Sequence, residues 1–217
     1  MIRYIFTSAV ETLCLISAFY FLRGETERHW RLHPWYLLLV VATDATGGYL
    51  AHVCHVSNTW LYNLFIPIEG IFIGYFLFRL CKRYGMQRTY WQLFAAVLIV
   101  CYTIERVFSV TTPHYCYWTT IFMSLVFILG TIRYAYLLLK AAPQSLPLQR
   151  HAPSIWVCAV SLFYFGTFVA TLLAEPLITA RVKIADTPLY SAVYFLLNLM
   201  LYGLWIVTFI YRYRSRH

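Results

Sequence analysis

The chain has 217 residues, of which 61% are apolar or aromatic and only 12% are charged. Soluble domains are about half apolar and about a quarter charged, so this composition excludes an ordinary soluble protein. Membrane-spanning helices need about 20 largely apolar residues each, and the apolar runs described below leave only short links between them. The sequence therefore has no room for a separate soluble catalytic or DNA-binding domain.

Seven apolar runs each have the length of a membrane-spanning helix. Pro34, Pro113, Pro153 and Pro188 punctuate the links, as expected where a helix begins or cannot continue. The sequence predicts an all-α fold, a single domain over residues 1–217 in the form of a seven-transmembrane-helix bundle. The predicted spans are residues 2–22, 35–56, 60–81, 90–108, 115–139, 155–174 and 189–211.

The net charge of +9 would suggest nucleic acid in a soluble chain, but the basic residues gather at the ends of the spans, in alternate links and the C-terminal tail. These residues are Arg23, Arg28, Arg31, Arg79, Lys82, Arg83, Arg88, Lys140, Arg150, Arg212, Arg214 and Arg216. In the last link, Arg181 and Lys183 are offset by Glu175 and Asp186. The positive-inside rule then predicts a multi-pass protein of a bacterial inner membrane, with its N-terminus outside and its C-terminus in the cytoplasm.

Several cofactor classes are excluded or not expected. The last span contains no Lys, which excludes a retinal Schiff base of the kind found in microbial rhodopsins. Nucleotide-binding and serine-hydrolase motifs are absent from the sequence. The six cysteines are scattered and are expected to be buried thiols, although Cys54 and Cys116 fall near the same outer surface, where they could pair.

Charged and amide side chains within the spans are the candidate functional residues. A charge at bilayer depth costs at least about 2.5 to 3.5 kcal/mol, so such groups are expected to face the bundle interior and to have a use. The candidates for ligand binding or proton relay are Glu69, Asp44, Glu11, Asn198, Asn63, Glu105 and Arg106. Because short links make the first three spans neighbours, Glu11, Asp44 and Glu69 are expected to share one polar site.

Glu69 is the central candidate because Pro67 lies two residues before it and Gly70 directly after it. Proline removes a backbone hydrogen bond and predicts a kink at this point. A carboxylate beside a helix defect is a common way to build a binding site at the membrane midplane.

Two other polar patterns follow helical spacing and fit either a helix-packing seam or the wall of a polar cavity. They consist of Asp44, Gly48, Ala51 and His55 in the second span, and Tyr190, Tyr194, Asn198 and Tyr202 in the last.

Three histidines, His52, His55 and His114, map near the outer surface. The i, i+3 spacing of the first two could present two imidazoles to one zinc ion, as in a membrane-embedded hydrolase. The alternative is that all three are solvated interfacial residues. The remaining histidines are predicted to be ordinary loop residues on the cytoplasmic side: His29, His33, His151 and His217.

Motifs in three spans resemble those of a group of short, uncharacterised seven-helix membrane proteins of bacteria. They are Tyr62-Asn63, Pro67-Ile68-Glu69, Pro153, Trp156, Tyr164-Phe165-Gly166 and Asn198. Gly70 stands where that group is expected to have Phe. The resemblance implies action through a ligand or partner, not through a soluble domain. Pro67-Ile68-Glu69 also resembles the Pro-x-Glu element of membrane lycopene cyclases, whose expected second copy appears in reverse order as Glu175-Pro176.

Three functions remain open. The leading hypothesis is a sensor or receptor-like module that binds a small-molecule ligand or protons and contacts a cytoplasmic signalling partner. The second is a small-solute or proton-coupled carrier, and the third is an intramembrane enzyme, either a metal hydrolase or a lycopene-cyclase-like protein. In each case the bilayer is the expected environment, and no nucleic-acid partner is expected.

Overall fold

A computed structural model describes residues 2–108, 115–141, 152–179, 183–184 and 187–216. Within them, the long helices are α1 (Ile2–Phe21), α3 (His33–His52), α4 (Thr59–Lys82), α5 (Arg88–Phe108), α6 (Tyr117–Ala141), α7 (Ala152–Thr179) and α8 (Leu189–Arg214). A single turn of helix, α2 (Arg28–Arg31), precedes α3. Strands β1 (Lys183–Ile184) and β2 (Thr187–Pro188) pair antiparallel just before α8.

The helical fold class is confirmed, and the long helices coincide closely with the predicted spans. The main difference is that α3 ends at His52, because the chain turns there and His55 adopts a left-handed φ of 53°. The apolar residues Val53 and Val56 concealed this turn in the sequence. Some sequence features discussed above lie outside the described residues: Pro113, His114, Arg150, His151, Arg181, Asp186 and His217.

Five helices of the described chain, α4 to α8, are long and apolar enough to cross a membrane. The apolar stretch of α1 runs over Phe6–Phe21 and is shorter. The protein is therefore a helical membrane protein, as its composition predicts.

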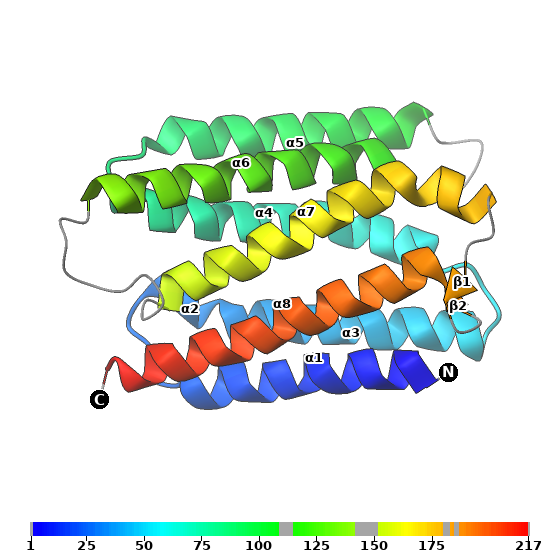
Figure 1. Cartoon of the computed structure of the whole chain (residues 1–217). Helices are drawn as coiled ribbons and strands as arrows, with labels where there is room; N and C mark the ends of the chain where they lie inside the picture. The colour runs from blue at the N-terminus through cyan, green and yellow to red at the C-terminus, as the bar shows by residue number, and fades with distance from the viewer. Residues whose placement is uncertain (1, 109–114, 142–151, 180–182, 185–186, 217) are drawn as a thin grey trace.

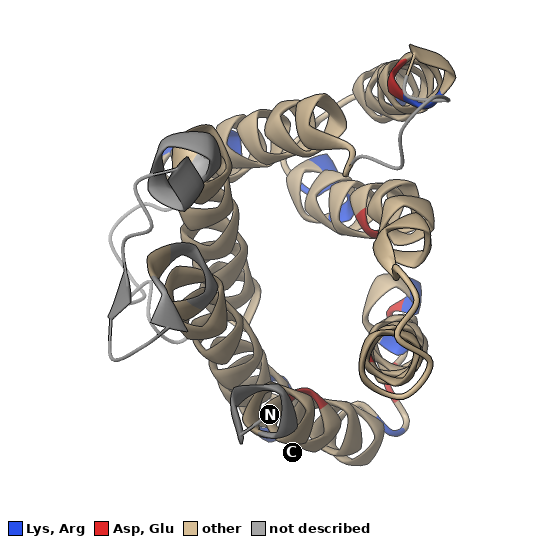
Figure 2. Ribbon diagram, turned by 90° about the vertical axis from the view of Figure 1, so that its right-hand side faces the viewer, with Lys and Arg blue, Asp and Glu red and all other residues tan. Residues whose placement is uncertain are grey.

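Six of the long helices form a closed ring, in the order α1, α3, α4, α6, α7 and α8, with α8 packing back against α1. Figure 2 looks along this ring. The remaining helix, α5, lies outside the ring against α4 and α6, at the top of Figures 1 and 2, and Leu98 is its one fully buried side chain. The interior of the ring is therefore lined by the other six helices.

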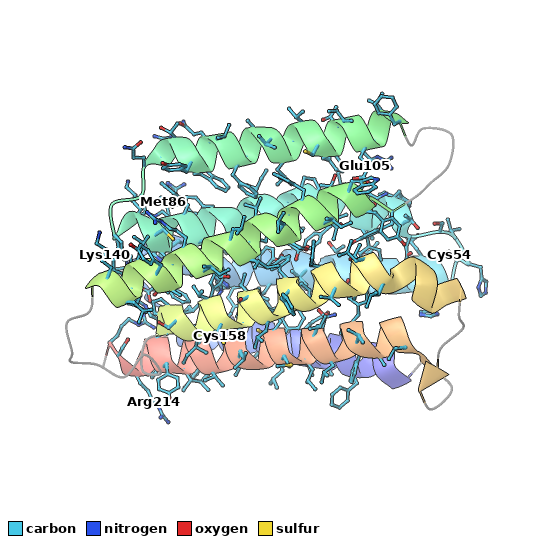
Figure 3. The ribbon with its side chains drawn as sticks, turned by 45° about the horizontal axis from the view of Figure 1, so that its top comes forward. Cys54, Met86, Glu105, Lys140, Cys158 and Arg214 are labelled. Atoms are coloured by element: carbon cyan, nitrogen blue, oxygen red, sulfur yellow. The ribbon has the colours of Figure 1, made fainter. Side chains whose placement is uncertain are left out.

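The basic links and the C-terminal end of α8 share one end of the bundle. Figure 3 shows Met86, Lys140 and Arg214 at this end, and Cys54 and Glu105 at the other. We call them the basic end and the opposite end. This arrangement is the one that the alternating charge pattern predicts.

Helices α7 and α8 approach closely at Gly166. A Cβ atom at this position would lie 2.3 Å from Cδ2 and 3.1 Å from Cγ of Leu197. Small residues allow such close approach between membrane helices. In contrast, a Cβ atom at Gly203 of α8 would meet no other atom within 4 Å.

The substitution Gly166→Ala should destabilise the bundle by about 1 to 3 kcal/mol, because the added methyl group overpacks the α7–α8 contact. The matched control Gly203→Ala should be neutral or stabilising, since Ala favours helix over Gly by up to about 1 kcal/mol. Thermal unfolding in detergent measures both changes. Equal shifts in the midpoints of the two variants would contradict the close contact.

Candidate functional site

Three carboxylic acids come from consecutive helices of the ring: Glu11 of α1, Asp44 of α3 and Glu69 of α4. Glu11 is 2% exposed and shares a side-chain hydrogen bond with Asp44. Asp44 also interacts electrostatically with Glu69. We call these residues the acid cluster. Their proximity is the one expected from the short links between the helices.

The position of Asp44 depends on a tight contact between α3 and α4. A Cβ atom at Gly47 would lie 2.7 Å from the hydroxyl oxygen of Tyr62, so only glycine allows this approach without a shift. Asn58 secures the same contact by donating from Nδ2 to the carbonyl oxygen of Gly47 at 3.0 Å. Tyr62 is thereby placed to donate a hydrogen bond to Asp44, one turn earlier on α3.

Glu69 connects α4 to the far side of the ring. The hydroxyl of Tyr164 on α7 donates to Oε1 of Glu69 at 2.6 Å, and Tyr164 is itself 2% exposed. Helix α4 continues without a break across Pro67. Tyr36 of α3 and Tyr202 of α8 are also buried and interact electrostatically with the acid cluster.

Tyr36, Tyr62 and Tyr164 are site residues that the sequence did not reveal. Tyrosine is abundant in this chain, with 19 residues, so its presence in an apolar run carried little information. Helical phase relative to the acids was the available signal, since Tyr62 lies seven residues before Glu69 and Tyr36 lies eight before Asp44.

The acid cluster has an unfilled hydrogen-bonding position. Oε2 of Glu11 is buried and has no partner among the described residues. A hydrogen bond between two carboxyl groups requires that one of them carry a proton, as in the shared-proton dyads of aspartic proteases. Buried polar atoms without partners are uncommon and call for an explanation. Chemically, this arrangement can hold and release a proton.

Three other candidates bind the N-terminal end of α6 instead of joining the acid cluster. Oδ1 of Asn63 accepts from the backbone N–H of Cys116 at 3.0 Å. Glu105 accepts from two backbone N–H groups of the first turn, at 2.9 and 2.8 Å. Arg106 hydrogen bonds to the side chain of Cys116. The first turn of a helix has unpaired N–H groups and a positive dipole end, so Asn63 and Glu105 stabilise α6 by accepting hydrogen bonds there.

Asn198 lies in the seam between α1 and α8, where it lines a small recess with Thr7 and Tyr202. Its Nδ2 donates to the carbonyl oxygen of Tyr194 on the same helix at 3.0 Å. Tyr194 in turn shares a 3.1 Å hydrogen bond with Thr171 of α7. For Tyr194, the packing-seam alternative is therefore correct. The side chain of Tyr190 lies outside the described residues.

His52 and His55 do not lie on one helix face, as the zinc hypothesis assumed, and His114 lies outside the described residues. His55 follows the end of α3 in a left-handed conformation, so it does not share a helix face with His52 or continue the stripe from Asp44. Over the described part of the chain, no group of three or more His, Cys, Asp or Glu side chains is arranged to hold a metal ion. Cys54 and Cys116 are both free thiols.

Two histidines predicted to be loop residues are instead buried. His33 is fully buried, and its Nε2 accepts a hydrogen bond from Nε1 of Trp156 at 2.9 Å. His33 is the first residue of α3. Its imidazole lies inside the helix ring, among aromatic side chains of α4, α7 and α8. We call this set the aromatic layer: Trp30, His33, Phe72, Phe76, Trp156, Trp205 and Phe209.

A network of ion pairs lies beyond the aromatic layer, at the basic end. Arg212 of α8 makes a two-point contact with Glu25, with N–O distances of 2.9 and 3.1 Å, and also pairs with Glu27. Arg83, after α4, pairs with Glu27 as well. Burial alone would raise the pKa of Glu25, but hydrogen bonds from Arg212 and the Glu27 backbone, with the charges of Arg212 and Arg216, lower that pKa overall.

His29 lies beside this network and is 2% exposed. Burial lowers the pKa of His29 from 6.5 to about 4, with further lowering by the charges of Arg83, Arg79 and Arg212. Glu27, whose Oε2 is 3.3 Å from Nε2 of His29, opposes this shift without cancelling it.

Comparisons with protein-family models, curated proteins and solved structures give no match for the chain.

The stability of the bundle should increase with pH between about 4 and 6.5. In this pH window His29 is protonated in the unfolded chain but neutral in the folded protein. This one group therefore makes the free energy of unfolding rise by up to about 1.4 kcal/mol per pH unit. The lowered pKa of Glu25 acts in the same direction. The stability that Glu25 contributes is lost as the pH falls through its pKa in the folded state. Midpoints of thermal unfolding across this range test the prediction.

Replacing His29 by Gln should flatten this pH dependence, whereas the same change at the exposed His52 should leave it intact. An unchanged slope in His29→Gln would show that His29 is protonated equally in both states.

Proposed function

We propose that this protein is a seven-span sensor or receptor-like module of the bacterial inner membrane, with its N-terminus outside and its C-terminus in the cytoplasm. The acid cluster binds a proton, and the basic end contacts a cytoplasmic partner. Support for the seven spans comes from the ring, which α1 and α3 complete together with four of the five helices of clearer membrane character. The resemblance to short seven-helix bacterial proteins is consistent with this, since its motif residues Glu69 and Tyr164 are in direct contact.

The observation that carries the proposal is the hydrogen bond between Glu11 and Asp44, together with the unpartnered Oε2 of Glu11. If the shared proton leaves, two negative charges face each other in a medium of low dielectric, and their repulsion is strong. Proton binding therefore favours one arrangement of α1 relative to α3. Such a site converts occupancy into a change of helix packing, which is what a sensor requires.

Continuous packing connects the acid cluster to the basic end. Tyr36 stacks on Phe72 with centroids 4.0 Å apart, and both rings contact His33 of the aromatic layer. At the other side of this layer, the guanidinium of Arg212 lies 5.5 Å from the centroid of the Trp30 ring. A shift at the acid cluster can therefore be transmitted to α8 by rigid aromatic contacts.

Infrared difference spectroscopy of the purified protein can test proton binding. Between acidic and alkaline buffer, the wild type should lose the C=O band of about one protonated carboxyl per chain, because the Glu11–Asp44 pair shares one proton. Asp44→Asn and Glu11→Gln should each remove this band. Glu105→Gln is the matched control, since Glu105 caps α6 away from the acid cluster and should leave the band unchanged.

The proposal fails if Asp44→Asn and Glu11→Gln, both folded, keep the wild-type band. It also fails if Glu105→Gln removes the band as completely as they do.

A carrier is the second candidate, and the position of Glu69 favours it. Glu69 follows a proline within α4 and is held by a hydrogen bond from the opposite side of the ring. Breaking this contact would remove a link between α4 and α7, and relative movement of such elements is what alternating access requires. Proton or cation flux in proteoliposomes that Glu69→Gln abolishes would favour the carrier. Proton binding without flux would favour the sensor.

Topology can be tested by cysteine labelling in a variant whose exposed native cysteines, Cys54 and Cys158, are replaced by Ala. A cysteine at Ser57 should react with a membrane-impermeant maleimide on intact spheroplasts. One at Met86 should react only after the membrane is opened, because the basic end faces the cytoplasm. Labelling of both from the same side would contradict the seven-span arrangement. Ser145 and Asp186, which the same scheme places inside and outside, lie outside the described residues.

A further inference from the structure

Two cavities lie side by side between the peripheral helix α5 and the ring. The first has a volume of about 290 Å³ and is enclosed by α4, α5 and α6. The second has a volume of about 480 Å³ and lies at the basic end, around the link between α4 and α5. Met86, Tyr90 and Arg133 line both cavities, so the two adjoin, and we call the pair one space in two parts. Figure 3 shows Met86 at this end of the bundle.

The two parts of this space differ in chemistry. The deep part is walled by apolar and aromatic side chains, among them Leu77, Phe94 and Phe127. Its mouth is formed by polar groups, including Tyr84, Gln87 and the guanidinium of Arg133. Among the described residues that line either part, none is acidic. The space is therefore amphipathic, with its positive charge at the mouth.

Arg133 is available to a ligand. Its side chain is exposed, and its guanidinium lies 5.5 Å from the centroid of the Tyr136 ring. Within the described chain, no carboxylate forms an ion pair with it. This contrasts with Arg83 and Arg212 at the same end, which are both paired with Glu27.

We propose that this space is a binding site for one anionic phospholipid of the leaflet at the basic end. The phosphate binds Arg133 at the mouth, and one acyl chain occupies the apolar part between α4, α5 and α6. Basic pockets between membrane helices are suited to anionic headgroups, and the size and lining match those of ordinary ligand sites. The site shares no residue with the acid cluster and is independent of the function proposed above.

The position of α5 gives the acyl chain a route of entry. Helix α5 packs outside the ring, and Leu98 is its one fully buried side chain. The cavity is therefore bounded on one side by a helix that buries few side chains against the bundle. Close packing at Gly74, where a Cβ atom would lie 2.4 Å from the Phe94 ring, fixes α5 near the middle of α4. The acyl chain of the lipid can therefore enter from the membrane beside the Gly74–Phe94 contact, without displacing the helices of the ring.

The test compares thermal stabilisation of the full-length, delipidated protein by three additives. These are phosphatidylglycerol, phosphatidylcholine with the same acyl chains, and inorganic phosphate. Phosphatidylglycerol should stabilise the wild type most. Arg133→Gln should weaken its apparent affinity by about fivefold, the value of one basic contact with an anionic lipid. Arg214→Gln is the matched control, an exposed arginine at the same end that lines neither cavity, and should bind as the wild type does.

A second pair of variants tests the apolar part without touching a charge. A Cβ atom at Gly130 would lie 3.4 Å from Leu77, which is ordinary contact, so Gly130→Ala should fold and bind normally. Gly130→Leu fills the cavity and should reduce both stabilisation and the amount of lipid that copurifies, as measured by mass spectrometry.

Equal stabilisation by the two lipids would overturn recognition of the headgroup. An equal effect of inorganic phosphate would show a free anion site, and equal losses in Arg133→Gln and Arg214→Gln would show only general attraction to charge. Unchanged lipid binding in a folded Gly130→Leu protein would exclude the cavity. Each of these outcomes contradicts the proposal.

Discussion

The contact between Glu25 and Arg212 joins the two ends of the chain, and the ring depends on it. Glu25 follows α1, Arg212 lies in the last turn of α8, and 187 positions separate them in the sequence. Breaking one partner of a buried ion pair leaves an uncompensated charge, at a cost of about 3 to 5 kcal/mol. Helices α1 and α8 pack against each other along the same seam. The Glu25–Arg212 ion pair therefore stabilises the contact that closes the ring around the polar groups of its interior.

The enclosed interior is arranged in layers along the bundle. Ion pairs occupy the basic end, the aromatic layer follows, and the acid cluster lies beyond it with Tyr36 as the connecting residue. A dry layer of large rings separates two sets of charged groups that would otherwise share water. Electrostatic interactions within each set are stronger for this reason, since less solvent screens them.

The sequence predicted the helices and their order because long apolar runs, prolines and basic links are strong local signals. The expectation that Glu11, Asp44 and Glu69 share one site came from the short links, which force consecutive helices to be neighbours, and the hydrogen bond between Glu11 and Asp44 is consistent with it. It did not predict that Asn63 and Glu105 cap α6, since both contacts join distant residues whose spacing follows no local rule. His33 was assigned to a loop because α2 and the start of α3 contain charged residues, which resemble a link when burial is unknown.

The peripheral position of α5 has a consequence for assembly. Membrane helices insert first and associate afterwards, and the six-helix ring makes no structural use of α5 in closing on itself. Yet the first turn of α6 obtains two of its hydrogen-bond acceptors from Glu105, near the end of α5. An assembling chain that has formed the ring without α5 therefore still exposes unpaired N–H groups to the membrane boundary. Docking of α5 removes this defect, so the helix that lies outside the ring is also the one that completes the hydrogen bonding of its neighbour.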